Sequence, residues 1–236
     1  MKTSKPAVLF DMDGVIIHNS DFHVRAWTEF AREYGRELTP DEVKMLLGST
    51  NAEYMRFVLG RTPSATEVSD AVTRKEALYR EIYAPHLRAP EGLLALFDAI
   101  AASGVSMGIA TGAPQANIDF TLDGLGIRHY FEQIADASQV AHGKPAPDTY
   151  LLAASKLGAD PRSCVVIEDA IAGVNSGKAA GMKVIAITSS YPAKILRQHC
   201  SPDAIIDSFL DLRYDTSAAL AILREICGCV FTLGNP

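Results

Sequence analysis

Short apolar runs recur along the chain and alternate with stretches in which apolar residues return at helical spacing. The runs span residues 7–10, 105–110, 164–167 and 184–187, with a weaker one at 204–206. Several of them are apolar at almost every position, as is typical of parallel strands covered by helices on both faces. The pattern predicts an α/β fold built on a doubly wound, mostly parallel sheet.

One long gap between the first and second runs interrupts this alternation. It holds roughly ninety residues with helical patterning and no convincing strand, and its first stretch places Phe22, Trp27 and Phe30 at helical spacing. Two S/T-x-x-E capping boxes, at residues 39–42 and 64–67, mark the starts of two later helices. We therefore expect an inserted all-α domain over residues 18–88 and a core domain formed by residues 1–17 and 89–236.

Composition and charge narrow the choice of partners. Hydrophobic residues make up 48% of the 236 residues and charged residues 21%, close to the averages of folded soluble domains. A net charge of −6 argues against sequence-independent binding of nucleic acid, because such binding depends on basic side chains. The negative net charge does not exclude a small phosphorylated ligand, because the electrostatic field at a binding site is set by the nearest charges.

The cysteines and the apolar runs also bear on the compartment. Cys164 and Cys200 stand apart, and Cys227 with Cys229 forms a C-x-C that matches no zinc-binding pattern, so we expect free thiols in a reducing compartment. The segment before Asp11 is too short for a signal peptide, and no apolar run approaches the length of a membrane span. The expectation is a cytoplasmic protein without membrane contact.

Two carboxylates follow the first predicted strand. Asp11 and Asp13 stand two residues apart where the run 7–10 ends, so both side chains point the same way if the strand pleat persists. Ligands of open parallel sheets bind beyond the carboxyl ends of the strands, which makes this a candidate site. Taken alone, D-x-D-G is a weak signal and is more typical of a solvated turn.

Later segments supply other groups that phosphate chemistry needs. Thr111 with Gly112 follows the second predicted strand, Lys144 lies on a proline-rich segment, and the third run, 164–167, is followed by Glu168 and Asp169. Each has an ordinary reading as a helix cap or a surface charge. Together, four carboxylates at one sheet edge would repel one another unless a cation lay among them.

A hard divalent cation with oxygen ligands meets that demand, and Mg²⁺ suits a site that also holds a substrate phosphate. We expect Asp11 to attack phosphorus and form an aspartyl-phosphate, with Lys144 and the ion screening the repulsion between the two anions. Asp13 would act as general acid and base. The sequence therefore predicts a magnesium-dependent phosphoryl-transfer enzyme.

The same segments resemble a known family. In their order and approximate spacing they are similar to the motifs of the haloacid dehalogenase (HAD) superfamily, in particular its β-phosphoglucomutase-like subgroup. The resemblance covers nearly the whole chain and rests on residues 11–15, 111–112, 144–148, 168–169 and 172–174. It implies a Rossmann-like core, a helical cap that closes over the substrate, Asp11 as nucleophile and Asp13 as acid and base. Thr111 and Lys144 would bind phosphate, and the metal site would comprise Asp11, the Asp13 carbonyl, Asp169 and an assisting Glu168.

The resemblance extends to the inserted domain. Residues 22–27 resemble the first cap helix of the subgroup, whose histidine, here His23, faces the active site. The substrate-binding set that we expect comprises His23, Gly48, Asn51, Lys75, Thr111, Gly112, Ala113 and Lys144. Lys75 matches a cap lysine of the mutases, although a solvated helical lysine explains it equally well. Asn51 stands where the mutases carry an arginine that anchors the distal phosphate, which weakens a mutase interpretation.

Several functions are compatible with these residues. We favour a hydrolase that releases phosphate from a small metabolite, with a sugar phosphate as the expected substrate. A β-phosphoglucomutase-type isomerase is the main alternative, and a pyrophosphatase or a noncatalytic binding domain is less favoured. We expect the enzyme to act as a monomer.

Overall fold

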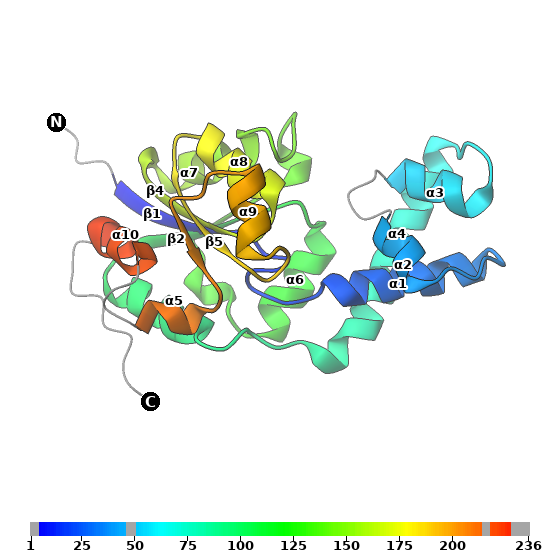
Figure 1. The fold of residues 1–236 in the computed structure, drawn as a ribbon, viewed down its shortest axis with the longest axis horizontal. Coiled ribbons are helices and arrows are strands. Elements are labelled where there is room, and N and C mark those ends of the chain that lie inside the picture. The colour runs from blue at the N-terminus through cyan, green and yellow to red at the C-terminus, as the bar shows by residue number, and fades with distance from the viewer. Residues whose placement is uncertain (1–4, 46–50, 214–217, 228–236) are drawn as a thin grey trace. The chain divides into compact units, whose positions relative to one another are not determined.

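The computed structural model describes residues 5–45, 51–213 and 218–227, and it divides the chain into two compact units. The first, which we call the core unit, consists of Met1–His18 and Arg88–Pro236. The second, which we call the helical unit, consists of Asn19–Leu87. Figure 1 shows the path of the chain through both.

The core unit is built on one parallel sheet. Its strands are β1 (Lys5–Phe10), β2 (Ser106–Thr111), β3 (Gln133–Asp136), β4 (Ala159–Glu168), β5 (Lys183–Ile187) and β6 (Ala204–Ile206). They lie in the order β3-β2-β1-β4-β5-β6, and every neighbouring pair is parallel. The predicted α/β fold with a doubly wound parallel sheet is confirmed, and β1 lies near its centre.

One strand was missing from the sequence prediction. β3 has only four residues, begins at the exposed Gln133 and lies at the edge of the sheet. An edge strand is buried less completely than a central one, so its sequence lacks the continuous apolar run by which the other strands were predicted. The apolar run at 164–167 likewise covers only the buried end of β4, which begins at Ala159.

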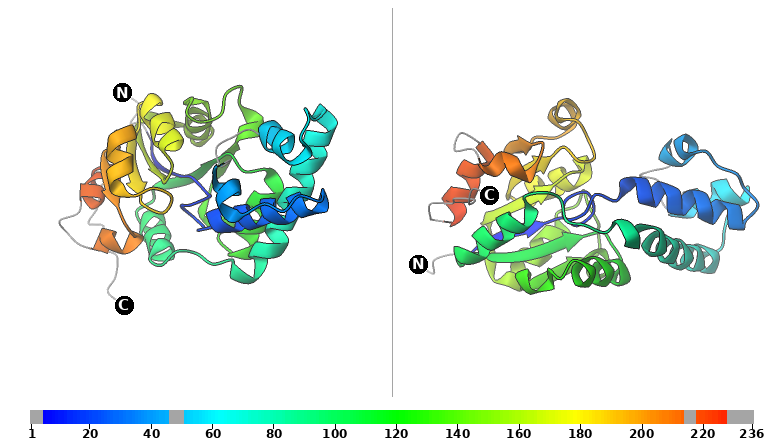
Figure 2. Two further views of the ribbon diagram at one scale, coloured as in Figure 1. Left: turned by 45° about the vertical axis from the view of Figure 1, so that its right-hand side comes forward. Right: turned by 90° about the horizontal axis from the view of Figure 1, so that it is seen from below.

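Helices pack on both faces of this sheet, as Figures 1 and 2 show. They are α5 (Leu93–Ala102), α6 (Gln115–Gly124), α7 (Asp148–Leu157), α8 (Ile171–Ala179), α9 (Ala193–His199) and α10 (Ala218–Cys227), with short 3-10 turns at Arg128–Tyr130, Ala137–Gln139 and Phe209–Arg213. Successive strand residues point to opposite faces. Leu9 accordingly joins a cluster with Tyr150 and Val174, whereas Phe10 packs edge-on against Phe97 at 5.1 Å between ring centroids.

The helical unit contains α1 (Ser20–Glu33), α2 (Pro40–Met45), α3 (Asn51–Leu59), α4 (Ala65–Tyr83) and a 3-10 turn at Ala84–His86. Both predicted capping boxes are confirmed. The Ser64 hydroxyl accepts from the Glu67 N–H while the Glu67 carboxylate accepts from the Ser64 N–H, and Thr39 and Glu42 make the same pair of bonds. A buried apolar cluster that includes Trp27, Phe30 and Met55 holds the helices together.

No helix within the described ranges is both long and apolar enough to cross a membrane.

We predict that Phe97→Ala destabilises the core unit by about 3–5 kcal/mol, because it removes a fully buried ring and leaves a cavity beside Phe10 and Phe131. Urea unfolding followed by circular dichroism measures the loss. Leu94→Ala on the same helix is the control: Leu94 is 45% exposed, so its truncation should cost less than about 1 kcal/mol. Equal losses in the two variants would contradict the packing described here.

Candidate active site

Two strand ends bring acidic residues together at the carboxyl edge of the sheet. β1 and β4 pair with Phe10 opposite Ile167, and the N–H of Asp11 continues this ladder by donating to the Ile167 carbonyl at 3.0 Å. Asp11 therefore leaves β1 beside Glu168, the last residue of β4. The sequence predicts both residues at the carboxyl edge of the sheet. The parallel register of β1 and β4 explains why Asp11 lies beside Glu168.

Lys144 lies between these two carboxylates. Its Nζ donates to Oδ1 of Asp11 at 2.6 Å and to Oε1 of Glu168 at 2.8 Å. Only 14% of the lysine side chain is exposed, against 11% for Asp11 and 1% for Glu168, so these are charge-assisted bonds largely shielded from water. Burial works to lower the pKa of Lys144, but the two carboxylates outweigh it and raise that pKa well above its usual value.

Glu168 is fixed on its other side by backbone groups. Its Oε2 accepts from the N–H groups of Asp169 and Ala170, each at 2.7 Å, just ahead of the N-terminus of α8. The Gly173 backbone approaches so closely that an added Cβ would fall 1.5 Å from Oε1 of Glu168. Glycine at 173 is therefore required by the position of this carboxylate.

Asp169 completes a group of three buried carboxylates. One carboxylate oxygen from each of Asp11, Glu168 and Asp169 lies within 4.8 Å of the others. Burial raises the pKa of Asp169 to about 8, with the neighbouring Glu168 carboxylate adding to the effect. Burial likewise raises the pKa of Asp11 to about 7 against the opposing charge of Lys144. Ionising all three groups here is costly unless a further positive charge is present.

A divalent cation fits this donor set. Three carboxylates at this spacing are the oxygen ligands that Mg²⁺ takes, while the single ammonium group of Lys144 cannot balance three negative charges. Gly14, at φ +82°, fits against the group because it lacks a Cβ: one placed there would fall 1.9 Å from Oδ2 of Asp169. The residues that would hold the ion are Asp11, Glu168 and Asp169.

The other residues predicted for the core are placed around this cluster. Asp13 follows Asp11 in a turn, and its charge contributes to raising the pKa of Asp11, but its carboxylate is not part of the group of three. Thr111 ends β2, the neighbour of β1, and its buried hydroxyl accepts from the Ala113 N–H at 3.0 Å. Gly112 between them is exposed.

The residues predicted for substrate binding in the helical unit form a cluster of their own. Lys75 is only 5% exposed, and its Nζ lies 2.9 Å from Nδ1 of His23 and 2.7 Å from Oε1 of Glu76. The reading of Lys75 as a solvated helical lysine is therefore wrong. His23 also stacks on Tyr79 at 4.0 Å. Asn51 is exposed at the start of α3, and the prediction for Gly48 falls outside the described residues.

Sequence reasoning missed two side chains of the acidic cluster. The Tyr150 hydroxyl donates to Oε1 of Glu168 at 3.3 Å, and its ring lies 4.7 Å from the Lys144 ammonium. Ser190, just beyond β5, donates to Oδ2 of Asp169. The rule that ligands gather at the carboxyl ends of strands would have found Ser190 had it been applied to β5. A buried tyrosine in α7 carries no comparable signal.

Comparisons with known proteins agree with this geometry. A family model described as a haloacid dehalogenase-like hydrolase matches residues 5–181. The chain is 34% identical over 184 residues to fructose-1-phosphate phosphatase YqaB of Escherichia coli (strain K12), covering 75% of this chain and 94% of that protein. It is 30% identical over 195 residues to β-phosphoglucomutase of Bacillus subtilis (strain 168), covering 79% and 84%.

A longer relative is SUPPRESSOR OF QUENCHING 1, chloroplastic, of Arabidopsis thaliana, which is 35% identical over 210 residues; the match covers 85% of this chain but only 19% of that protein. Among solved structures, a HAD hydrolase, family IA, variant 3, from Entamoeba histolytica HM-1:IMSS superimposes with a TM-score of 0.83. It is 30% identical and covers 92% of this chain and 99% of that chain. These matches confirm the resemblance seen in the motifs: the chain belongs to the haloacid dehalogenase-like hydrolases, with relatives of the β-phosphoglucomutase type.

Proposed function

We propose that the chain is a Mg²⁺-dependent phosphatase that hydrolyses a small phosphorylated metabolite, a sugar phosphate in the first instance, through an aspartyl-phosphate on Asp11. One observation carries the proposal: the Lys144 ammonium joins Asp11 to Glu168 within a buried group of three carboxylates. A purely structural ion pair would need one carboxylate. The additional carboxylates can bind a cation, and the cation can in turn bind an anionic substrate.

Each residue has a part in the reaction. Asp11 attacks phosphorus, and the bond from phosphorus to the leaving oxygen breaks as the bond to Asp11 forms. Asp13 gives a proton to the leaving oxygen, and then takes one from the water that attacks phosphorus and frees phosphate from Asp11. Lys144 and the Thr111 hydroxyl bind phosphate oxygens. When bound, Mg²⁺ would reduce the repulsion between the carboxylate and the phosphate.

The proposal gives the helical unit the role of a cap that recognises the rest of the substrate. The buried Lys75 and the half-buried His23 form a polar pair in that unit, and Asn51 offers an exposed amide. An amide hydrogen-bonds to sugar hydroxyl groups but does not neutralise a second phosphate. This favours a monophosphate as the substrate, with residues 18–88 acting as the cap and residues 1–17 and 89–236 as the catalytic core.

A mutase is the second candidate. The buried ammonium of Lys75 beside His23 could serve a phosphate in transit, and one relative is a β-phosphoglucomutase. The two functions differ only in whether water or a second hydroxyl takes the phosphoryl group from Asp11. The test is a screen of sugar monophosphates, pyrophosphate and β-glucose 1-phosphate with Mg²⁺, with released phosphate and isomerised sugar phosphate both measured. Isomerisation that outpaces release would replace the phosphatase assignment.

We predict that Asp11→Asn lowers turnover roughly a thousand-fold or more, because a neutral amide cannot act as the nucleophile. Asparagine has nearly the same shape as aspartate, so the circular dichroism spectrum should be unchanged and the melting temperature should not fall. Asp70→Asn, at an exposed position on α4, is the matched control and should keep full activity. Turnover retained in Asp11→Asn would remove the covalent mechanism.

Gly173→Ala tests the placement of Glu168. We expect it to lower both activity and stability, since its methyl group would occupy the space of the Glu168 carboxylate and push it away from Lys144. The loss of stability should be about 1–3 kcal/mol in urea unfolding. Gly143→Ala is the matched control: apart from its two chain neighbours, no residue has an atom within 4 Å of the added methyl group, so stability should not fall. A fully stable Gly173→Ala variant would show that Glu168 is not held as described.

A further inference from the structure

Two consecutive serines beyond β5 reach the loops of two other strands. The Ser189 hydroxyl donates to the carbonyl of Gly14, in the turn that follows β1, at 2.5 Å. The Ser190 hydroxyl donates to Oδ2 of Asp169, in the loop that follows β4. β5 pairs with β4 but not with β1, so these bonds extend beyond the sheet ladder.

The contacts converge on one oxygen atom. Gly14 lies against Asp169 so closely that an added Cβ would fall 1.9 Å from Oδ2 but 3.1 Å from Oδ1. Oδ2 thus faces Gly14 and receives the Ser190 hydroxyl, whereas Oδ1 receives none of the hydrogen bonds found among the described residues. The Ser190 hydrogen bond therefore holds one oxygen of the Asp169 carboxylate and restricts the orientation of the group.

We propose that Ser190 is a positioning residue for the divalent cation: it fixes the Asp169 carboxylate so that Oδ1 is presented to the ion. The inference rests on the proposed function, which supplies the cation. A carboxylate held by an outer hydrogen bond has fewer orientations to lose when it binds a metal, and such partners affect affinity strongly. Nothing in the motifs used to predict the site includes Ser190.

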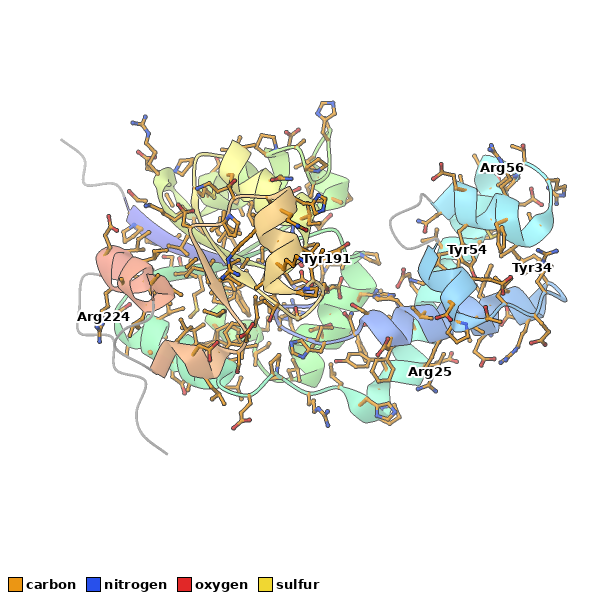
Figure 3. The ribbon with its side chains drawn as sticks, viewed as in Figure 1. Arg25, Tyr34, Tyr54, Arg56, Tyr191 and Arg224 are labelled. Atoms are coloured by element: carbon orange, nitrogen blue, oxygen red, sulfur yellow. The ribbon has the colours of Figure 1, made fainter. Side chains whose placement is uncertain are left out.

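Anchoring of the segment alone does not require these serines. Thr188, the preceding residue, already ties it to β6: its N–H donates to the Ile206 carbonyl at 3.0 Å and its hydroxyl to Oδ1 of Asp207 at 2.8 Å. The next residue, Tyr191, is 39% exposed at the approach to α9 and is labelled in Figure 3. In this segment the Ser190 hydroxyl donates to a carboxylate of the acidic cluster. The Thr188 hydroxyl donates to Asp207, which does not belong to that cluster.

Calorimetric titration of the full chain with Mg²⁺, without substrate, tests the inference. Ser190→Ala should bind Mg²⁺ about ten-fold more weakly than the wild type, at an unchanged melting temperature in the metal-free state. Ser190→Thr keeps the hydroxyl and should restore most of the affinity. Thr188→Val, which removes a hydroxyl-to-carboxylate bond from the same segment, should bind as the wild type does. In steady-state assays, Ser190→Ala should raise the Mg²⁺ concentration for half-maximal rate more than it lowers the rate at saturating Mg²⁺.

The outcomes separate this inference from the proposed function. A wild type that binds Mg²⁺ while Ser190→Ala binds it equally well overturns the positioning role alone. Equal weakening in Ser190→Ala and Thr188→Val also overturns it, because the serine would then merely support the segment. A wild type that binds no Mg²⁺ overturns the proposed function and this inference with it.

Discussion

The ammonium group of Lys144 lies between two carboxylates that are almost completely withdrawn from water. Asp11 comes from the end of β1 and Glu168 from the end of β4, and the parallel register of these strands places them side by side. Without the lysine, two buried negative charges would face each other where little solvent screens them, a situation that proteins avoid by protonation or by ion pairing. The ion pair therefore joins three segments of the core unit at one point.

The surroundings of this ion pair determine what it can do. Backbone N–H groups and Tyr150 hold Glu168, while Gly173 leaves room for it. Asp169 adds a third carboxylate, and because the single ammonium group of Lys144 cannot balance three ionised carboxylates, the group is suited to hold a cation. Because these groups are fixed before any ligand binds, little reorganisation is needed when negative charge moves during phosphoryl transfer. Burial thus raises the free-energy cost of ionising the carboxylates, and the same burial suits the cluster to phosphoryl transfer.

The sequence predicts that charged residues gather at this edge of the sheet, but it does not predict every strand or every side chain that contacts them. Apolar runs identify buried strands, so β1, β2, β4 and β5 were predicted, and β6 at one edge of the sheet more weakly. The short strand β3 at the other edge lacks such a run. Asp11, Lys144, Glu168 and Asp169 were predicted because unusual charges at strand ends and a recognisable order of motifs mark them. Tyr150 and Ser190 are ordinary residues in a helix and a loop, and only the fold brings them to the cluster. For Lys75 the pattern permitted a solvated side chain, and its burial follows from helix packing that periodicity does not resolve.

In the proposed mechanism the Asp11 carboxylate itself takes the phosphoryl group. Rapid mixing with a sugar monophosphate that the enzyme turns over, followed by acid quenching, peptide digestion and mass spectrometry, tests this directly. The expected result is one added phosphoryl group on the peptide that contains Asp11, present with Mg²⁺ and absent when the metal is chelated. Phosphate release with no phosphoryl group on that peptide, or with the group on another residue, would contradict it.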